Sequence, residues 1–235
     1  MTDLSEFSIT KRWPAQHPDR IQLYSFPTPN GIKVSAALEE MELPYEAHRI
    51  SIMDNDQMEP EFIDLSPNNK IPAILDPNGP GGKPIGVFES GAILLYLAEK
   101  TGKLISADPH EKWETIQWIM FQMGGAGPMF GQLGFFHKFA GAEYEDKRPR
   151  DRYVNESRRL FGVMEKRLEG RDYFVGDAYS IADLALWPWV RTIDGFYEAG
   201  ELVGTDAFPK VREWVARCEA RPASQVGINV PPREG

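Results

Sequence analysis

Cysteine is almost absent from this chain of 235 residues, and long apolar runs are missing altogether. The one cysteine, Cys218, excludes an internal disulfide framework and any CxxC redox pair. No apolar run approaches the roughly 18 residues that a membrane span needs. The polar stretch from Met1 to Asp19 also lacks the apolar core of a secretory signal. We therefore expect a reduced, cytoplasmic protein with no membrane partner.

An excess of basic charge is missing as well. The chain has 26 Lys and Arg against 35 Asp and Glu, which gives a formal net charge of −9. It therefore has no excess of positive charge that would bind the phosphate backbone of a nucleic acid. Nucleic acid is therefore not an expected partner. The four histidines are scattered without metal-ligand spacing, so we expect no metal site. With 42% apolar and 26% charged residues, the composition is that of an ordinary globular protein.

The first half of the chain alternates between strand and helix patterns. Strands are predicted over residues 21–26, 45–51, 71–75 and 85–88. The helical spacing of apolar residues predicts helices over 32–41 and 89–100. With a further helix between the second and third strands, this β-α-β-(α)-β-β-α order predicts an α/β layer.

Strand patterns vanish after about residue 108. Helices are predicted over residues 111–123, 150–168, 180–190 and 208–220. A glycine-rich stretch from Gly124 to Pro128 is interpreted as a break after the first of them. The fold class expected is an α/β domain followed by an all-α domain. Its parts are an N-terminal extension over 1–20, the α/β domain over 21–102, a linker over 103–108 and the helical domain over 109–235.

Ile71-Pro72 falls inside a strand pattern, where proline cannot donate a ladder hydrogen bond. The pair is either an edge-strand proline or a cis-proline that turns the Ile71 backbone outward to pair with an extended ligand. Asn68, Asn69 and Lys70 precede it and supply polar groups at the same rim. The second alternative makes this segment a candidate binding edge.

Glu89 and Ser90 lie at a predicted strand-to-helix junction. Ser90 is followed by small residues and has the pattern of a helix N-cap, which by itself is structural. The free N–H groups of a helix N-terminus together with a hydroxyl also bind a carboxylate, and Glu89 beside them can hold an ammonium. A carboxylate and an ammonium on adjacent groups form the head of an amino acid. The junction is therefore a candidate site for such a head.

Ser180 and Asp183 form the pattern of a capping box before an apolar helix. The Ser180 hydroxyl is expected to accept from the backbone of Asp183, whose carboxylate accepts from the Ser180 N–H. Tyr179 and Leu184 are placed to form a hydrophobic staple. We interpret the pattern as a folding signal and not as a functional site.

The chain resembles a cytosolic glutathione transferase in four segments: TPNG at 28–31, NNKIPAIL at 68–75, FESGAILLYLAEKTG at 88–102 and YSIAD at 179–183. The TPNG turn and Trp187-Pro188-Trp189 resemble the Nu class, a bacterial group with disulfide-bond reductase activity. The resemblance covers about residues 21–222. It implies a thioredoxin-like N-terminal domain, a helical C-terminal domain, and a homodimer with glutathione sites at the cleft between subunits.

The resemblance also implies which residues bind glutathione. Glu89 and Ser90 would hold the γ-glutamyl head, in agreement with the site inferred above for an amino-acid head. The backbone of Ile71, between Lys70 and Pro72, would pair with the cysteinyl part. The other residues implied are Gln57 at the glycyl or peptide portion, Thr28 and Asn30 at the sulfur, and Arg152 reaching toward glutathione from the helical domain.

Activation of the glutathione thiol must come from groups that do not ionise. Tyr24 and Ser25 lie within the strand pattern rather than at the turn, and Asn30 at the turn cannot titrate. Lowering a thiol pKa from about 8.5 by two units takes about 2.7 kcal/mol. A charge-assisted hydrogen bond gives roughly 1.5–3 kcal/mol, and a helix N-terminus about 0.3–1. Thr28 and Asn30 at the helix end are therefore the predicted catalytic residues.

The expected function is glutathione-dependent reduction of disulfide bonds, with hydroperoxides as a further substrate class and no protein cysteine involved. Two alternatives stay open: conjugation of glutathione to electrophiles, and a non-catalytic regulatory or scaffold protein with the same fold. The expected ligands are glutathione, as two thiol molecules or one disulfide per subunit, and a small disulfide, peroxide or electrophile. The extension before Ile21 has no assigned role beyond an arm across the dimer.

Overall fold

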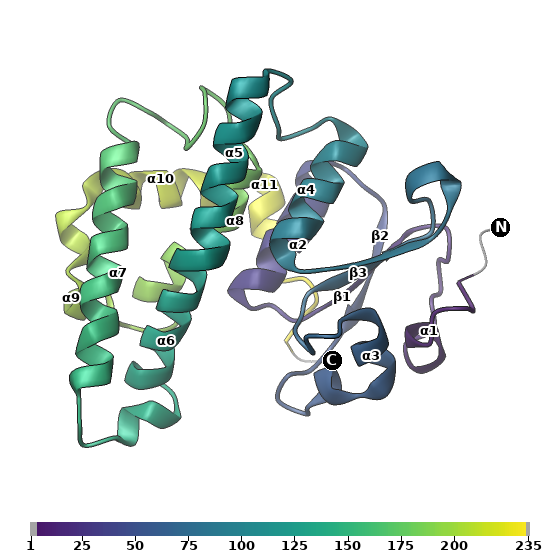
Figure 1. Ribbon diagram of the computed structural model, residues 1–235, viewed down its shortest axis with the longest axis horizontal. Helices are drawn as coiled ribbons and strands as arrows, with labels where there is room; N and C mark the ends of the chain where they lie inside the picture. Colours follow the sequence, from purple (N-terminus) through teal and green to yellow (C-terminus); the bar gives the residue numbers. More distant parts are fainter. Residues whose placement is uncertain (1–3, 234–235) are drawn as a thin grey trace. The chain divides into compact units, whose positions relative to one another are not determined.

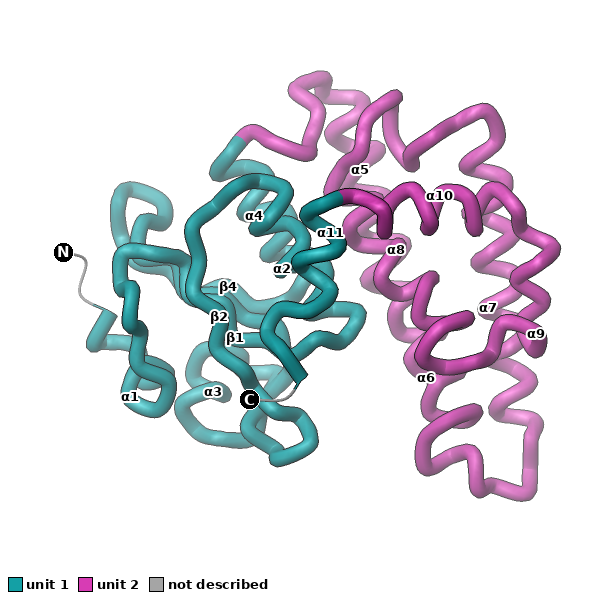
Figure 2. Tube along the Cα trace, turned by 180° about the vertical axis from the view of Figure 1, so that it is seen from behind, with its two compact units in different colours: residues 1–101, 222–235 teal, residues 102–221 magenta. Residues whose placement is uncertain are grey.

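The computed structural model describes residues 4–233, which fall into two compact units (Figure 2). The first unit contains the chain up to Thr101 and returns from Pro222 onward, and the second runs from Gly102 to Arg221. The first unit has a four-stranded sheet with helices packed on it, and the second is helical (Figure 1). The predicted fold class, an α/β domain and an all-α domain, is confirmed.

The sheet of the first unit has the strand order β2-β1-β3-β4. Strands β1 (Ile21–Ser25) and β2 (Tyr45–Arg49) are parallel. Strand β3 (Ala73–Asp76) runs antiparallel to both β1 and β4 (Ile85–Phe88). All four strands were predicted, but β3 begins two residues later than expected.

At one edge of this sheet, where the strands terminate, β1 and β4 end and β3 begins. Tyr24, near the end of β1, is paired with Ala73 at the start of β3, and Ala73 is paired in turn with Phe88 at the end of β4. The segments that follow β1, precede β3 and follow β4 therefore meet at this edge. Candidate residues from the sequence lie in all three segments.

Helices cover the sheet. Helices α2 (Pro29–Glu40) and α4 (Ser90–Thr101) pack against each other, and α4 also contacts β3 and β4. The shorter α3 (Pro60–Leu65) lies between the second and third strands, where a helix was predicted without bounds, and it contacts β4. Its Phe62 and Leu65 are buried in one cluster with strand residues of the face that carries Tyr24, Ala73 and Leu75.

The N-terminal extension packs onto the first unit of its own chain. Its short helix α1 (Ile9–Arg12) contacts α3, and Leu4 and Ile9 are buried in the cluster beneath α3. The backbone N–H of His17 donates to the Glu46 carboxylate at 2.7 Å. The described part of the extension therefore contributes to the core of this unit.

The last helix, α11 (Pro222–Gly227), packs on α2. The Ser35 hydroxyl donates to the Gly227 carbonyl at 2.7 Å. A Cβ at Gly227 would lie 2.6 Å from the backbone nitrogen of Ala36, so this approach requires glycine. The predicted helical domain over 109–235 is corrected at its end, because the chain from Pro222 onward belongs to the first unit.

The second unit contains six α-helices within the described chain. They are α5 (Pro109–Phe121), α6 (Gly127–His137), α7 (Arg148–Arg167), α8 (Ile181–Asp194), α9 (Gly200–Val203) and α10 (Pro209–Glu219). Short 3₁₀ turns occur in both units: η1 (Asp56–Met58), η2 (Pro80–Gly82), η4 (Ala140–Glu143) and η5 (Thr205–Ala207). The four helices predicted for this half correspond to α5, α7, α8 and α10.

The break predicted at Gly124 to Pro128 is wrong. A π-helical turn, η3 (Gln122–Ala126), leads from α5 directly into α6. Pro128 lies in the first turn of α6, the helical position where proline is best tolerated. A Cβ at Gly127 would lie 2.4 Å from the Gln122 Nε2, so the glycine here makes room for a buried side chain of the preceding turn.

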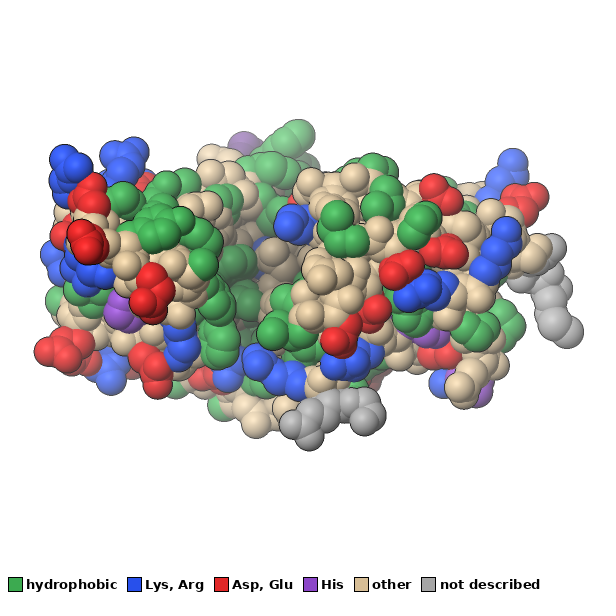
Figure 3. Space-filling model, turned by 90° about the horizontal axis from the view of Figure 1, so that it is seen from below, with side chains coloured by type: hydrophobic (Ala, Val, Ile, Leu, Met, Phe, Trp, Pro, Cys, Tyr) green, Lys and Arg blue, Asp and Glu red, His purple; other side chains and the backbone are tan. Residues whose placement is uncertain are grey.

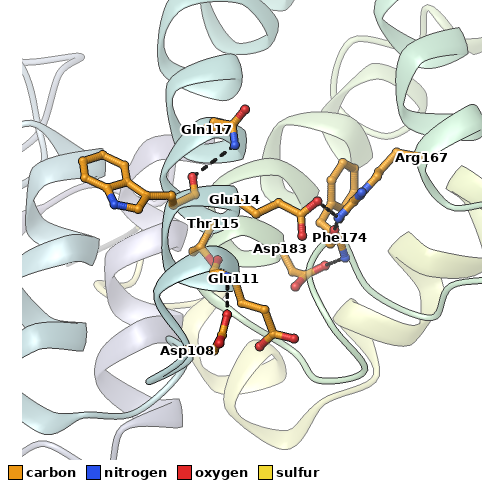
Figure 4. A network of polar contacts seen from close by, with 9 residues as sticks. Asp108, Glu111, Glu114, Thr115, Gln117, Arg167, Phe174 and Asp183 are labelled. Atoms are coloured by element: carbon orange, nitrogen blue, oxygen red, sulfur yellow. Dashed lines mark hydrogen bonds and ion pairs between the residues drawn. The ribbon is translucent and has the colours of Figure 1, made fainter.

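The buried carboxylate of Asp183 accepts several hydrogen bonds in the core of the second unit. Its carboxylate accepts from the backbone N–H of Ser180 at 2.9 Å and of Phe174 at 3.0 Å. The carbonyl of Phe174 accepts from Arg167 at 2.7 Å, so both polar backbone groups of Phe174 are bonded (Figure 4). The predicted capping box of Ser180 and Asp183 is confirmed.

Charges of both signs are interspersed on the face drawn in Figure 3, and no extended surface of one sign covers it. Within residues 4–233, no helix combines the length and apolar character that crossing a membrane requires. In that same stretch of chain, His, Cys, Asp and Glu side chains form no group of three that could hold a metal ion.

Candidate functional site

The segment that follows β1 ends at the N-terminus of α2. Thr28 is the N-cap of this helix, and its hydroxyl accepts from the Gly31 N–H at 3.3 Å. Glycine is required at position 31, because a Cβ there would lie 2.0 Å from the carbonyl oxygen of Phe26. Thr28 and Asn30 are partly exposed. Their side chains therefore stand at the positively polarised end of the helix.

The segment before β3 contains the Ile71–Pro72 peptide bond, which is cis. This is one of the two alternatives that the sequence left open. The Ser66 hydroxyl donates to the Lys70 carbonyl at 2.9 Å. Ile71 is partly exposed, and within residues 4–233 its backbone groups have no hydrogen-bond partner. Its N–H and C=O are therefore available to an extended ligand.

The segment after β4 contains Glu89 and Ser90. Glu89 is exposed, with a φ of 69°, and its carboxylate accepts from the Asn68 amide at 3.5 Å. Ser90 is the first residue of α4 rather than the residue before it, and it is only 3% exposed. An exposed carboxylate thus stands beside a helix N-terminus that carries a hydroxyl, the arrangement expected for an amino-acid head.

Gln57 lies in the turn η1, which a side-chain contact joins to the loop before β3. In this contact the Asn69 amide donates to the Met58 sulfur at 2.9 Å. The Oε1 atom of Gln57 is buried and has no hydrogen-bond partner among the described residues. Because buried acceptors are normally satisfied, Gln57 is a candidate for a ligand contact.

The first unit thus brings most of the predicted binding residues to one edge of its sheet. The remaining one, Arg152, belongs to α7 of the second unit and is exposed. With Tyr153 and Arg159 it lines an open cavity of about 610 Å³.

Lys33 is a residue of this site that sequence reasoning missed. It lies in α2 with no exposed surface, and its Nζ donates to the Ser90 Oγ at 3.2 Å. The signal was present in the sequence, since Lys33 precedes the apolar Ala37 by four residues and therefore shares its helix face. A charged residue on the buried face of a helix needs a specific partner.

Comparison with known proteins identifies the family. The profile of the glutathione S-transferase N-terminal domain matches residues 20–99, and that of the C-terminal domain matches residues 128–222. The chain is also 44% identical over 205 residues to the disulfide-bond oxidoreductase YfcG of Escherichia coli (strain K12), covering 87% of this chain and 92% of that protein. The chain belongs to the glutathione S-transferase family.

Two solved structures resemble this glutathione S-transferase closely. A glutathione transferase from Burkholderia graminis, crystallised with two glutathione molecules per subunit, is 66% identical, with a TM-score of 0.97 over 100% of this chain and 98% of that one. A glutathione transferase from Pseudomonas putida, with one glutathione disulfide per subunit, is 62% identical, with a TM-score of 0.96 over 98% of this chain and 100% of that one. The family resemblance inferred from the sequence is confirmed.

The first strand of this glutathione S-transferase offers no exposed hydroxyl for activating a thiol. Tyr24 and Ser25 are fully buried in β1. Burial, assisted by the charge of Glu46, raises the pKa of Tyr24 well above its usual 10. The Tyr24 ring is stacked on His48, with 4.7 Å between the ring centroids. Tyr24 and Ser25 are therefore core residues and not candidates for thiol activation.

The only cysteine of this glutathione S-transferase is also inaccessible. Cys218 lies in α10 with no exposed surface. Burial, followed by the charge of Asp183, raises the pKa of its thiol far above the usual value. Since the thiolate is the reactive form, Cys218 is chemically inert in the folded chain.

Proposed function

We propose that this glutathione S-transferase reduces small disulfides with glutathione thiols and without a protein cysteine. The observation that carries the proposal is the burial of Cys218, while Thr28 and Asn30 stand partly exposed at the start of α2. The relatives support it: one is named a disulfide-bond oxidoreductase, one holds two glutathione molecules per subunit, and one holds a glutathione disulfide. The reactive sulfur then belongs to a bound glutathione.

Glutathione would lie along the sheet edge described above. The α-carboxylate of its γ-glutamyl group would face Ser90 and the first turn of α4, and its ammonium would face Glu89. The Ile71 backbone would pair with the cysteinyl part, between Lys70 and Pro72. The other residues that we propose to contact glutathione are Gln57 at the glycyl end, Thr28 and Asn30 at the sulfur, and Arg152.

The reaction is two thiol–disulfide exchanges. In the first, the thiolate of one glutathione attacks a sulfur of the substrate RSSR, which forms the mixed disulfide GSSR and releases RS⁻. In the second, the thiolate of another glutathione attacks the glutathione sulfur of GSSR, which forms GSSG and releases the second RS⁻. Two glutathione thiols are thereby oxidised to one disulfide, and the two RS⁻ groups take up the two protons. Placing both glutathiones in one site aligns the attack.

Thr28, Asn30 and the N-terminus of α2 would lower the thiol pKa. A hydroxyl or amide N–H that donates to the sulfur and the positive end of the helix both favour the thiolate. Neither residue ionises, so the site activates the thiol by hydrogen bonds and dipoles alone.

A pair of assays tests the proposal. Turnover of hydroxyethyl disulfide with glutathione should exceed conjugation of chlorodinitrobenzene. A third assay, with cumene hydroperoxide, tests the further substrate class. Faster conjugation than disulfide reduction would favour the electrophile alternative. The non-catalytic alternative predicts no turnover of either substrate, and a calorimetric titration would then show whether a glutathione site is retained.

We further propose a cytoplasmic homodimer of the Nu class. On α5, Trp113 and Met120 are 66% and 54% exposed and lie seven residues apart, on one helix face. A second copy of the chain would cover such apolar side chains. Sedimentation at micromolar concentration should give twice the 26.6 kDa of one chain. A 26.6 kDa species alone would contradict the dimer.

A further inference from the structure

Lys33 is completely buried next to the proposed site for the γ-glutamyl carboxylate. Its Nζ lies 3.2 Å from the Oγ of Ser90, which is itself 3% exposed. The two residues belong to α2 and α4, which pack against each other. A lysine with no exposed surface is rare, because removing an ammonium from water is costly. Its Nζ therefore depends on polar contacts inside the fold, and the Ser90 hydroxyl is one of them.

The direction of the hydrogen bond determines what Ser90 can offer. An ammonium only donates, so the Ser90 oxygen accepts from Lys33. The proton of the hydroxyl then points away from Lys33. Ser90 also begins α4, where the first backbone N–H groups carry the positive end of the helix dipole. The lysine and the helix end both favour an anion at this point.

Glu89, the residue before Ser90, supplies the opposite charge. Burial lowers the pKa of Lys33, and the charge of Glu89 acts against that shift. Glu89 is exposed, whereas Lys33 is buried. The first turn of α4 thus lies next to a buried lysine and an exposed carboxylate, an arrangement complementary to a zwitterionic amino-acid head.

We propose that Lys33 is a positioning residue for glutathione, which orients the Ser90 hydroxyl and provides the buried positive charge for the γ-glutamyl α-carboxylate. This inference rests on the proposed glutathione site. It assigns carboxylate recognition to Lys33 acting through Ser90, and ammonium recognition to Glu89. An analogue without the α-carboxylate should therefore be insensitive to Lys33.

The experiment compares two ligands on matched variants. Lys33→Met removes the charge at similar volume, and Lys83→Met is the control, because Lys83 is exposed in the same unit. Calorimetry measures the affinity for glutathione and for γ-aminobutyryl-cysteinyl-glycine, which lacks the α-carboxylate. Lys33→Met should weaken glutathione binding tenfold or more and leave the affinity for the analogue unchanged. Lys83→Met should bind both ligands as the wild type does.

A double-mutant cycle adds a second readout. Because Lys33 acts through Ser90, the combined variant of Lys33→Met and Ser90→Ala should lose less glutathione affinity than the product of the two single losses. Independent, multiplicative losses would contradict the coupling. Equal weakening of both ligands by Lys33→Met, or unchanged glutathione affinity, would overturn the proposal.

Thermal melting shows whether each variant is folded. If Lys33→Met does not fold, Lys33→Gln keeps a donor to Ser90 and removes the charge, and it should still weaken glutathione binding and not analogue binding. Wild-type glutathione affinity in folded Lys33→Gln would reject the role of the charge. A wild-type chain that binds no glutathione at all would instead reject the proposed function, so the two failures are distinguishable.

Discussion

The indole N–H of Trp214 donates to the carboxylate of Asp183 at 2.9 Å, although 31 residues separate them in the sequence. Both side chains are buried. The same carboxylate accepts from the backbone at Ser180 and Phe174. One acidic side chain therefore ties the start of α8 to α10 and to the loop before α8. Burial is also the largest influence on this carboxyl group, and it raises the pKa of Asp183 to about 6.

We expect the stabilisation by Asp183 to increase as the pH falls. Its pKa in the folded chain lies above the ordinary 3.8, so between these values the folded chain binds a proton that the unfolded chain does not. This contribution is fully present below about pH 3.8 and is lost as the pH rises through about 6. Relative to Asp183→Asn, the wild type should gain about 1 kcal/mol of unfolding free energy between pH 7.5 and 5.

Denaturant unfolding of both proteins at the two pH values measures this difference in unfolding free energy. The contributions of the other titrating groups are the same in both proteins and cancel. Asp183→Asn should be less stable at both, because its amide cannot accept from all the donors that Asp183 serves. If the stability difference between the wild type and Asp183→Asn shrank on acidification, the pKa of Asp183 in the folded chain would lie below 3.8. The four hydrogen bonds to its carboxylate would then outweigh the effect of burial.

The sequence predicted the long elements and the capping box because each leaves a local signature. The strands of the sheet show β patterns, and the Ser180–Asp183 pair follows a short motif. Helix α3 spans only six residues, too few for a periodic pattern. The π-turn η3 was mistaken for a break because its glycines resemble a loop, whereas the fit of Gln122 over Gly127 depends on side-chain packing.

The candidate site was predicted unevenly for the same reason. Glu89 and Ser90 follow a motif, but Lys33 is charged in an otherwise apolar pattern, and only its contact across to α4 explains it. The return of α11 to the first unit also depends on a contact between distant residues, Ser35 and Gly227. A single sequence can show a charged residue on a buried helix face, but it does not show which distant residue is the partner.

Gly31→Ala should unfold or strongly destabilise the chain. The added Cβ would lie 2.0 Å from the Phe26 carbonyl oxygen and 2.6 Å from the Ser25 Oγ, so the backbone of the turn must move. We expect a loss of about 3 kcal/mol or more in denaturant unfolding. Gly162→Ala is the matched control, since Gly162 lies inside α7 and a Cβ there would have only an ordinary 3.9 Å contact with Phe208. This change should stabilise the chain by about 0.5–1 kcal/mol. Equal effects of the two changes would contradict this interpretation.

Ile9→Ala should destabilise the chain although it lies in the N-terminal extension. Ile9 is 1% exposed and is buried in the cluster beneath α3. Truncating a buried isoleucine costs about 2–5 kcal/mol, whereas Lys11→Ala, an exposed change in the same short helix, should cost less than about 0.5 kcal/mol. Thermal and denaturant unfolding compare the two. If Ile9→Ala were as stable as the wild type, the extension would not be part of the core.

Asn30→Ala should lose most of the disulfide reductase activity, and Cys218→Ala should keep nearly all of it. The Asn30 amide can donate to a thiolate at the start of α2, and without it only the helix dipole and Thr28 remain. Losing a hydrogen bond to a charged group, worth about 1.5–3 kcal/mol, should lower the rate roughly ten- to a hundredfold. Cys218 is buried, so removing its thiol affects packing alone, provided that turnover is measured well below the melting temperature. Glutathione and hydroxyethyl disulfide at saturating concentration give the rates. The opposite result, an inactive Cys218→Ala and an active Asn30→Ala, would show that a protein cysteine carries the chemistry.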